Sequence, residues 1–427
     1  MKWNLLFSLL ITAALAAQQV PQATDLPGKP FFIKATWFIG GAGNWDYLTM
    51  DPPAGRLFIA HGTSMQVRDV ESGTRAGEID GFYEARQVAL DGTGVVGYVS
   101  DGGLGKVFVF DRQTLKKIKE IDTGANPRSL VFDSLTSLLF VVRANPPAEG
   151  AGSESVRRRS ATRDTQPPDR SPEPGSTVRG VESVVTVIDT QTQTVLGEIH
   201  LAGLLGFAVE DSNGEIYVSV TDRNQVVRFN AQTVAALLHP QPSSAAPAAL
   251  AASEAVKPLA PPWINLDWTG VRPSSGDGRL RAYSLSPECS DPRALAMDNA
   301  HMRLFAACNN RTLVVLNTGT GEKVTTLPIG PGADAVGYDA EHGLLFTANG
   351  AAEGSLTIIR QDVTDTYAVI QTLPTRQRAS TLAVNPQTGA VYMVTDYHGV
   401  DLSKPGGIGT LEQKPVTGSF QVLQVAN

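Results

Sequence analysis

The sequence predicts an all-β fold: a seven-bladed β-propeller of four-stranded antiparallel blades, closed by an N-terminal strand and carrying two irregular insertions. Two observations predict this fold. One strand–turn–strand pattern recurs seven times, and an unpaired strand before the first repeat can complete the last one. The composition agrees, because 41 Gly and 27 Pro make 68 of 427 residues. That is about 16%, against roughly 12% in average proteins, and it favours a fold with many turns.

Each repeat contains an Asp, Glu or Asn that is followed seven residues later by Phe or Tyr. An apolar segment precedes the first member and a polar turn separates the two, which predicts a strand, a tight turn and a second strand. The pairs are Asp51/Phe58, Asp91/Tyr98, Asp133/Phe140, Glu210/Tyr217, Asp298/Phe305, Asp339/Phe346 and Asn385/Tyr392. The first members are 40, 42, 77, 88, 41 and 46 residues apart. Removing about 35–45 inserted residues from the two long steps leaves a period near 42, which is typical of propeller blades.

The second half of each repeat predicts two further strands. A β-branched run ends at an Asp or Asn whose side chain can accept a hydrogen bond from the backbone of the following turn. These residues are Asp69, Asp111, Asp189, Asn230 and Asn317. A fourth strand follows, as at 116–121, 195–201 and 323–329, so each repeat is a four-stranded meander.

The two ends of the chain predict how the ring closes. The last repeat has strands near 381–384, 391–394 and 419–425 but lacks an outermost strand, and the segment 31–40 reads as an orphan outer strand. We expect these two parts to pair, because closure removes two open sheet edges. The predicted propeller domain spans residues 31–427.

Insertions are expected at 144–182 and 236–278. The first is rich in Pro, Ser, Gly, Arg and Glu and predicts a solvated loop, with the alternative of an arm for an anionic partner through arginines 157–159. The second carries an apolar patch of Trp263, Ile264, Leu266 and Trp268. We expect this patch to pack on the propeller flank, and partner docking is the alternative.

The N-terminus reads as a signal peptide at 1–16, followed by a linker at 17–30. Lys2 precedes an apolar run, and Ala14-Leu15-Ala16 has the small-x-small form of a cleavage site. A buried N-terminal helix is the alternative. No later segment has about 18 consecutive apolar residues, so we expect a periplasmic or secreted protein without a transmembrane segment in the mature chain.

Charge and motifs exclude several classes. The net charge of −7 argues against nucleic-acid binding, and two Cys exclude a disulfide-dense scaffold and an Fe–S protein. The sequence has no Cys-x-x-Cys-His, Gly-rich phosphate loop, Gly-x-Ser-x-Gly or His-Glu-x-x-His motif. We expect a monomer.

Several segments resemble the YVTN repeat: LLFTANG at 344–350, VTVIDTQTQTV at 185–195 and VTTLPIG at 324–330. That repeat belongs to exported bacterial seven-bladed propellers, related in fold to the quinoprotein amine dehydrogenase β chain. A bacterial branch is matched by GNWDYLTMD at 43–51, LFIAHGT at 57–63, RLFAACNN at 303–310 and GSFQVL at 418–423. The resemblance covers about 31–427 and departs at both insertions and at Asp101-Gly102, where the branch has Asn-Gly. It implies fold and export but no reaction, because one fold hosts many chemistries.

Cys289 and Cys308 are candidates for a disulfide. If Met297 pairs with Arg303 across the turn, Cys308 lies opposite Pro292, three residues from Cys289. That is close enough for a bridge in an oxidising compartment, and the resemblance places a cysteine at both points. Two buried thiols or a metal pair are the alternatives.

The repeat also predicts which residues surround one mouth of the central channel. Five residues before the first member of each pair stand Asp46, Arg86, Arg128, Leu205, Arg293, Asp334 and Ser380. Ten residues after it stand His61, Asp101, Arg143, Val220, Cys308, Asn349 and Thr395, and His398 follows closely.

These residues allow three kinds of site. Arg86, Arg128 and Arg293 could bind a carboxylate, phosphate or uronate, or could pair with Asp residues and stabilise the mouth. Asp46, Asp101, Asp334 and Asn349 could hold Ca²⁺, although we predict no cofactor. His61 and His398 could form a pair for Zn²⁺ or proton transfer, or could be solvated loop histidines.

The favoured function is an exported binding or scaffold protein that holds a protein partner or a small anionic or glycan ligand at the channel mouth. The alternative is a channel-mouth enzyme, such as a metal-dependent lactone hydrolase or a quinoprotein-like oxidoreductase.

Overall fold

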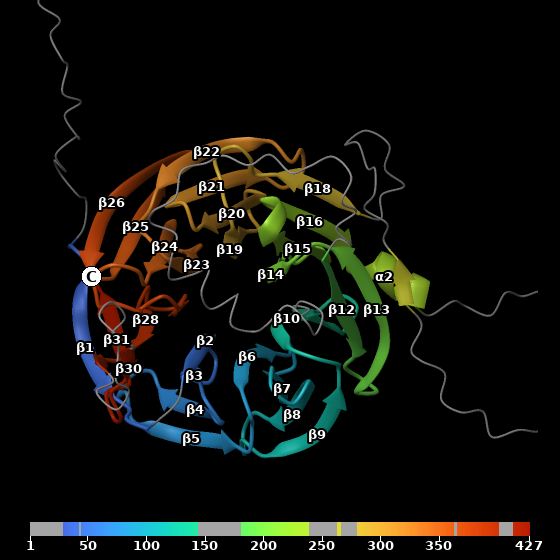
Figure 1. Ribbon diagram of the computed structural model, residues 1–427, viewed down its shortest axis with the longest axis horizontal. Helices are drawn as coiled ribbons and strands as arrows, with labels where there is room; N and C mark the ends of the chain where they lie inside the picture. Colours follow the sequence, from blue (N-terminus) through green and yellow to red (C-terminus); the bar gives the residue numbers. More distant parts are fainter. Residues whose placement is uncertain are drawn as a thin grey trace, which may run out of the picture.

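The computed structural model describes residues 29–41, 44–143, 181–238, 263–265, 280–362, 365–400 and 413–427. Seven antiparallel sheets of four strands stand side by side in a ring (Figure 1), which confirms the predicted propeller. In blades 1 to 6 the strands follow one another from the innermost to the outermost, so the chain runs outward through each sheet and then returns to the axis, whereas the outermost strand of blade 7 is the first strand of the chain.

The first three blades have the following strands. Blade 1 is β2 (Trp45–Asp51), β3 (Arg56–His61), β4 (Ser64–Asp69) and β5 (Arg75–Asp80). Blade 2 is β6 (Ala85–Leu90), β7 (Val96–Asp101), β8 (Lys106–Asp111) and β9 (Lys117–Asp122). Blade 3 is β10 (Pro127–Asp133), β11 (Leu138–Arg143), β12 (Glu182–Asp189) and β13 (Thr194–Ala202).

Four blades complete the ring. Blade 4 is β14 (Leu205–Glu210), β15 (Glu215–Val220), β16 (Gln225–Asn230) and β18 (Arg281–Ser284). Blade 5 is β19 (Pro292–Asp298), β20 (Arg303–Cys308), β21 (Thr312–Asn317) and β22 (Lys323–Pro328). Blade 6 is β23 (Ala333–Asp339), β24 (Leu344–Asn349), β25 (Ser355–Asp362) and β26 (Thr366–Pro374). Blade 7 is β27 (Leu382–Val384), β28 (Val391–Thr395), β31 (Gln421–Ala426) and β1 (Phe32–Phe38), and a small hairpin of β29 (His398–Val400) and β30 (Gln413–Pro415) lies between β28 and β31 in the chain.

The core is a set of seven apolar clusters, each lying between two neighbouring blades. The aromatic member of every repeat pair lies in the second strand and is at most 1% exposed. Alternate side chains of a strand point to opposite faces of its sheet, so each blade contributes to two clusters. The repeat aromatics are therefore the contacts that hold adjacent blades together.

The acidic and Asn residues of the repeats close the turns, as predicted. The Thr136 N–H donates to Asp133 at 2.8 Å, and the Thr114 N–H donates to Asp111 at 2.6 Å. Each of these bonds gives a partner to a backbone N–H of the turn, which has no neighbouring strand to bond to.

Closure of the ring by the N-terminal strand is confirmed. β1 pairs antiparallel with β31, from Phe32 opposite Ala426 to Phe38 opposite Gln421. Phe31, just before β1, packs edge-on against Phe346 of blade 6, with ring centroids 5.5 Å apart. Its N–H and C=O both bond to the Gln371 side chain, at 2.9 and 2.8 Å. The closing strand is thus anchored to blade 6 as well as to blade 7.

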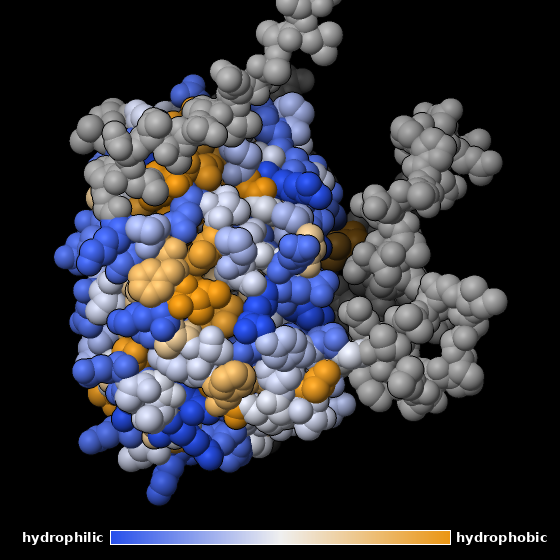
Figure 2. Space-filling view, turned by 90° about the vertical axis from the view of Figure 1, so that its left-hand side faces the viewer, coloured by the Kyte–Doolittle hydropathy of each residue, from blue (hydrophilic) through white to orange (hydrophobic). Residues whose placement is uncertain are grey.

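The side of the ring that carries β1 and β26 has apolar residues scattered among hydrophilic ones (Figure 2). Phe38 is 74% exposed and Phe32 51% exposed, so only part of the closing strand is buried.

Blade 4 differs from the prediction at its outer edge. Asn230 opens a helix, α2 (Ala231–Leu238), because its side chain accepts the Thr233 N–H at 3.0 Å and so caps the first turn. The outer strand of this blade is therefore β18, which follows the insertion. Within the second insertion, β17 (Trp263–Asn265) pairs parallel with β13 and extends blade 3, as expected for packing on the flank. Leu266, Trp268, residues 144–180 and the N-terminal 28 residues lie outside the described residues.

Cys289 and Cys308 lie at disulfide distance, with Cα atoms 5.5 Å apart, as predicted. The register used to predict this was wrong by one residue, since Met297 pairs with Leu304. A bulge between Pro292 and Ala294 restores the expected pairing of Pro292 with Cys308.

Phe31→Ala should lower the free energy of unfolding by about 3–5 kcal/mol, the usual cost of truncating a buried Phe. Phe31, just before β1, is 6% exposed and Phe38, at the far end of β1, is 74% exposed. Phe38→Ala is therefore the matched control and should change the free energy of unfolding by less than about 0.5 kcal/mol. Urea denaturation measures both. Equal effects of the two changes would contradict the anchoring role of Phe31.

Replacing both Cys289 and Cys308 with Ala should lower stability by roughly 3 kcal/mol, because the bridge closes a loop of 19 residues. The comparison is thermal unfolding of the wild type with and without reductant. Mass spectrometry that finds two free thiols in protein taken from the periplasm or medium would argue against the bridge.

Candidate functional site

The innermost strands of blades 1 to 6 all begin at the same end of the ring axis, which we call the upper mouth. Each of them carries a β-bulge or irregularity directly after its first residue. A bulge turns a side chain away from the regular alternation of a strand. The residues at these bulges include Asp46, Arg86, Arg128, Arg293 and Asp334, five of the residues predicted to form the site.

Two of the three arginines are joined to acids on neighbouring blades. Arg86 lies 2.7 Å from Asp46 and 2.7 Å from Glu84. Burial raises the pKa of Asp46, and the Arg86 charge opposes that shift. Arg293 lies 3.1 Å from Asp334 and 3.0 Å from Asp291. These pairs link blades 1 and 2 and blades 5 and 6, which is the stabilising arrangement that the sequence allowed.

Arg128 differs from its two equivalents. Its side chain is exposed and makes no hydrogen bond or ion pair with any other described residue. Its charge nevertheless reaches Asp46 and Tyr47, where it opposes the burial that raises both pKa values. Arg128 is therefore a cation of the upper mouth with capacity for a further partner.

Tyr47 and Phe207 form the floor of the mouth, and neither was predicted from the sequence. Their ring centroids lie 5.2 Å apart, although the residues belong to blades 1 and 4. Burial raises the pKa of Tyr47 above its ordinary value, so its hydroxyl stays protonated and can donate a hydrogen bond. The charges of Asp46, Arg128 and Asp334 all act on it.

A one-residue difference in blade 4 explains why Phe207 was missed. Tyr217 pairs with Val209, whereas Phe58, its equivalent, pairs with Thr49, two residues before Asp51. The turn residue of blade 4 is thus Asp211, not the predicted Glu210, and the Asn213 and Glu215 N–H groups both donate to Asp211 at 3.0 Å. Counting five residues back from Asp211 places Gly206, instead of Leu205, at the position that an arginine holds in blades 2, 3 and 5. Phe207 then occupies the same position as Tyr47.

The oxygens proposed for Ca²⁺ already have other partners. Asp101 is fully buried and accepts four backbone N–H groups, from Tyr83, Glu84, Gly103 and Leu104. Asn349 Oδ1 accepts from the Thr347 hydroxyl at 3.1 Å. Within the described ranges, no group of three or more His, Cys, Asp or Glu side chains gathers to hold a metal ion.

His61 and His398 each have a local environment of their own. His61 is buried and stacks on Phe420 with centroids 4.1 Å apart, and burial lowers its pKa. Gly41 covers the ring with φ of 91°, where a Cβ would come within 2.8 Å of His61 Cε1. His398 Nε2 lies 3.1 Å from Asp396, which also pairs with Arg378 at 3.3 Å.

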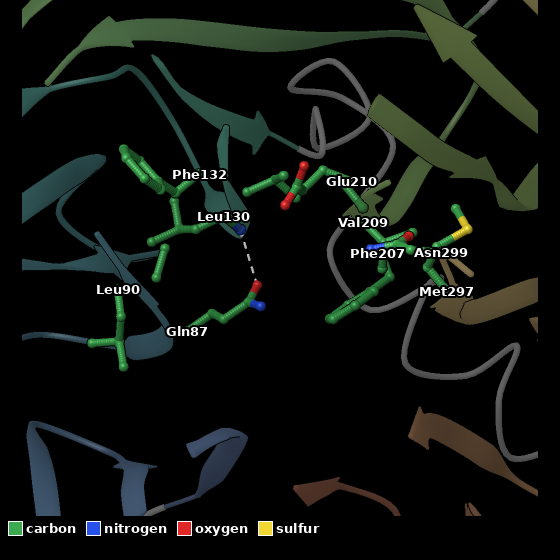
Figure 3. Close-up of a pocket in the computed structure, with 12 residues that line it drawn as sticks. Gln87, Leu90, Leu130, Phe132, Phe207, Val209, Glu210, Met297 and Asn299 are labelled. Atoms are coloured by element: carbon green, nitrogen blue, oxygen red, sulfur yellow. Dashed lines mark hydrogen bonds between the residues drawn. The ribbon is translucent and has the colours of Figure 1, made fainter. Parts of the chain in front are cut away.

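Below the Tyr47–Phe207 contact, the innermost strands β6, β10, β14 and β19 line an open pocket of 410 Å³ (Figure 3). Most of its wall is apolar and includes Leu90, Phe132 and Phe207. Glu210 and Gln87 are polar members of the lining, and the Leu130 N–H donates to Gln87 Oε1 at 2.9 Å. The sequence analysis did not place a pocket here.

Glu210 is held at the end of β14. Its carboxylate accepts the Ser212 N–H at 2.9 Å. Burial raises the pKa of Glu210, and the charges of Asp133 and Asp211 raise it further.

Comparisons with known proteins bear on the fold alone. No known family model and no curated protein matches this sequence. The structure of RRP9 WD40 repeats is similar with a TM-score of 0.59 and 9% identity, over 91% of this chain and 96% of that chain. The structure of U3-55K gives 0.58 and 9%, over 90% and 97%. A chain of the mitotic checkpoint complex gives 0.58 and 11%, over 98% and 99%.

This chain is a β-propeller. The similarity to these structures shows the fold. The resemblance to YVTN-repeat proteins and to the amine dehydrogenase β chain stays a prediction. Among the residues that the structure describes, no helix is long and apolar enough to cross a membrane.

Glu210→Gln should raise the melting temperature at neutral pH. The folded state binds the Glu210 proton more tightly than the unfolded state does, because the pKa is raised on folding. The ionised carboxylate therefore costs stability at neutral pH, and the cost disappears as the pH falls below the raised pKa. Gln keeps an acceptor for the Ser212 N–H, so the advantage of the variant should shrink in acid.

The matched control is Glu341→Gln, an exposed acid on the corresponding turn of blade 6, which should change the melting temperature little at any pH. A Glu210→Gln protein that melts below the wild type at neutral pH would contradict the assigned cost.

Proposed function

We propose that this protein is an exported propeller that acts as a binding module and holds an anionic group at the upper mouth, with Arg128 as the anchor. The observation that carries the proposal is the contrast among three equivalent arginines. Arg86 and Arg293 are each joined to two acids, whereas Arg128 is exposed and has no side-chain partner among the described residues.

The surroundings of Arg128 suit a carboxylate, phosphate or uronate group. A guanidinium can donate two parallel hydrogen bonds to such a group. The protonated hydroxyl of Tyr47, on which the Arg128 charge acts, supplies a further donor. The Tyr47 and Phe207 rings provide an apolar floor on which the body of a sugar acid or an acidic side chain of a partner protein can rest.

Export is part of the same proposal. The signal-peptide pattern at 1–16 supports it, and the close Cys289–Cys308 pair is compatible with an oxidising compartment. A mature chain that begins after Ala16, identified by N-terminal sequencing of protein from the periplasm or medium, is the expected result.

Arg128→Ala should weaken binding of the anion by about 1.5–3 kcal/mol, the range for a charge-assisted hydrogen bond. The screen is isothermal titration of the wild type against sugar acids, phosphates and dicarboxylates, followed by the variant with whichever anion binds. Salt should weaken wild-type binding, because the site is open to solvent.

Arg281→Ala is the matched control, since Arg281 is an exposed arginine on the outer strand β18 and should leave binding unchanged. Wild-type protein that binds no anion, or equal losses in the two variants, would refute the assignment of Arg128.

A further inference from the structure

We propose that the pocket below the Tyr47–Phe207 contact is a second binding site, for a small organic cation with an apolar body and one ammonium or amidinium group. It is separate from the anion site, because the Phe207 ring lies between the two. Arg128 lies at the start of β10 and Glu210 at the end of β14, so the two sites belong to opposite ends of the channel.

The pocket is suited to an apolar body. Its volume of 410 Å³ falls in the range of about 300–1,000 Å³ that is usual for small-molecule sites. Ala89, Leu130, Val131, Val209 and Met297 line it from four consecutive blades. Burying these surfaces against a ligand is favourable in proportion to the apolar area removed from water.

The charged group among the polar lining residues Gln87, Glu210 and Asn299 is the carboxylate of Glu210. Figure 3 shows Glu210 beside Val209 and across the pocket from Gln87. One oxygen of Glu210 accepts the Ser212 N–H, and the two side chains whose charges act on it, Asp133 and Asp211, are both acidic. A negative charge in apolar surroundings is costly unless a cation accompanies it.

A second carboxylate lies near this end of the channel and adds to the negative charge there. Asp133 is fully buried at the end of β10, next to Phe132 of the pocket. Its Oδ2 accepts from Thr136, but its Oδ1 has no hydrogen-bond partner among the described residues. Buried carboxylate oxygens almost always have a partner, so the unpaired oxygen of Asp133 adds uncompensated negative charge beside the pocket, although Asp133 does not line it.

The aromatic residues favour the same class of ligand. Phe132 and Phe207 both line the pocket, and the face of an aromatic ring attracts a cation within about 6 Å. An anion would meet Glu210 with no basic residue in the lining and with the charges of Asp133 and Asp211 nearby, and a neutral molecule would leave the carboxylate without a counter-ion. A cation satisfies the acids, the rings and the apolar walls together.

The test compares three probes of one shape, which are 2-phenylethylammonium, 2-phenylethanol and 3-phenylpropionate, by isothermal titration with the full chain at low salt. The wild type should bind the ammonium compound at least about 10-fold more tightly than the alcohol, and should not bind the carboxylate. Equal affinity for the ammonium compound and the alcohol, or no binding of the ammonium compound, would overturn the proposal.

Three variants locate the site. Glu210→Gln should weaken ammonium binding about 10-fold or more, whereas Glu341→Gln, which removes the same charge from an exposed turn of blade 6, should not. Val209→Trp, which fills the pocket and keeps Glu210, should abolish binding of both the ammonium compound and the alcohol. If Glu210→Gln does not fold, which circular dichroism detects, Val209→Trp still tests the site.

Arg128→Ala should leave ammonium binding unchanged, which separates this site from the anion site. Ammonium binding that survives both Glu210→Gln and Val209→Trp in folded protein would refute the placement.

Discussion

Ring closure by the pairing of β1 with β31 is the constraint on which the other features of the molecule depend. It joins Phe32 to Ala426, nearly the full length of the chain, so its contact is the least local in the fold. An open ring would leave two sheet edges and one apolar cluster exposed to water. Closure also fixes where the innermost strands begin. The Asp46–Arg86 and Arg293–Asp334 ion pairs each join two neighbouring blades of this closed ring.

One position of the innermost strand, four residues before the acid of the turn, determines which side chains reach the channel axis. In blades 2 and 3 this position holds Gln87 and Ser129, and each accepts a backbone N–H from the next blade, at 2.9 and 3.2 Å. These bonds satisfy inner-edge donors that no sheet neighbour can reach. In blades 1 and 4 the same position holds Tyr47 and Phe207, which extend to the axis and meet there. In blades 2 and 3 this position thus links adjacent blades. In blades 1 and 4 it supplies the two rings that lie between the upper mouth and the pocket below.

The fold was predictable because its signals are local and recur in every blade. The residue pairs, such as Asp51 with Phe58, mark a tight turn and a buried aromatic, and both follow from near neighbours in sequence. The site was predictable only in part. Sequence spacing placed Arg128 at the mouth, but it could not show that Arg86 and Arg293 have acidic partners on other blades. It also could not detect that the blade 4 turn is one residue shorter, and this error in register concealed Phe207.

Opposite charges at the two ends of one channel need a physical reason to persist. Arg128 and Glu210 would attract each other through water only weakly, but low-dielectric walls concentrate the field along the channel. The Tyr47–Phe207 contact places aromatic rings in that path, so neither side chain can relax toward the other. Each charge must therefore be satisfied at its own end, by solvent or by a ligand. The raised pKa of Glu210 indicates that its ionised carboxylate is poorly compensated at the lower end of the channel. Among the described residues one backbone N–H compensates it, and solvent does the rest. Sites that carry a stability cost of this kind are retained when binding offsets the cost. The stability cost of ionised Glu210 is thus also the physical argument for a ligand at the lower end of the channel.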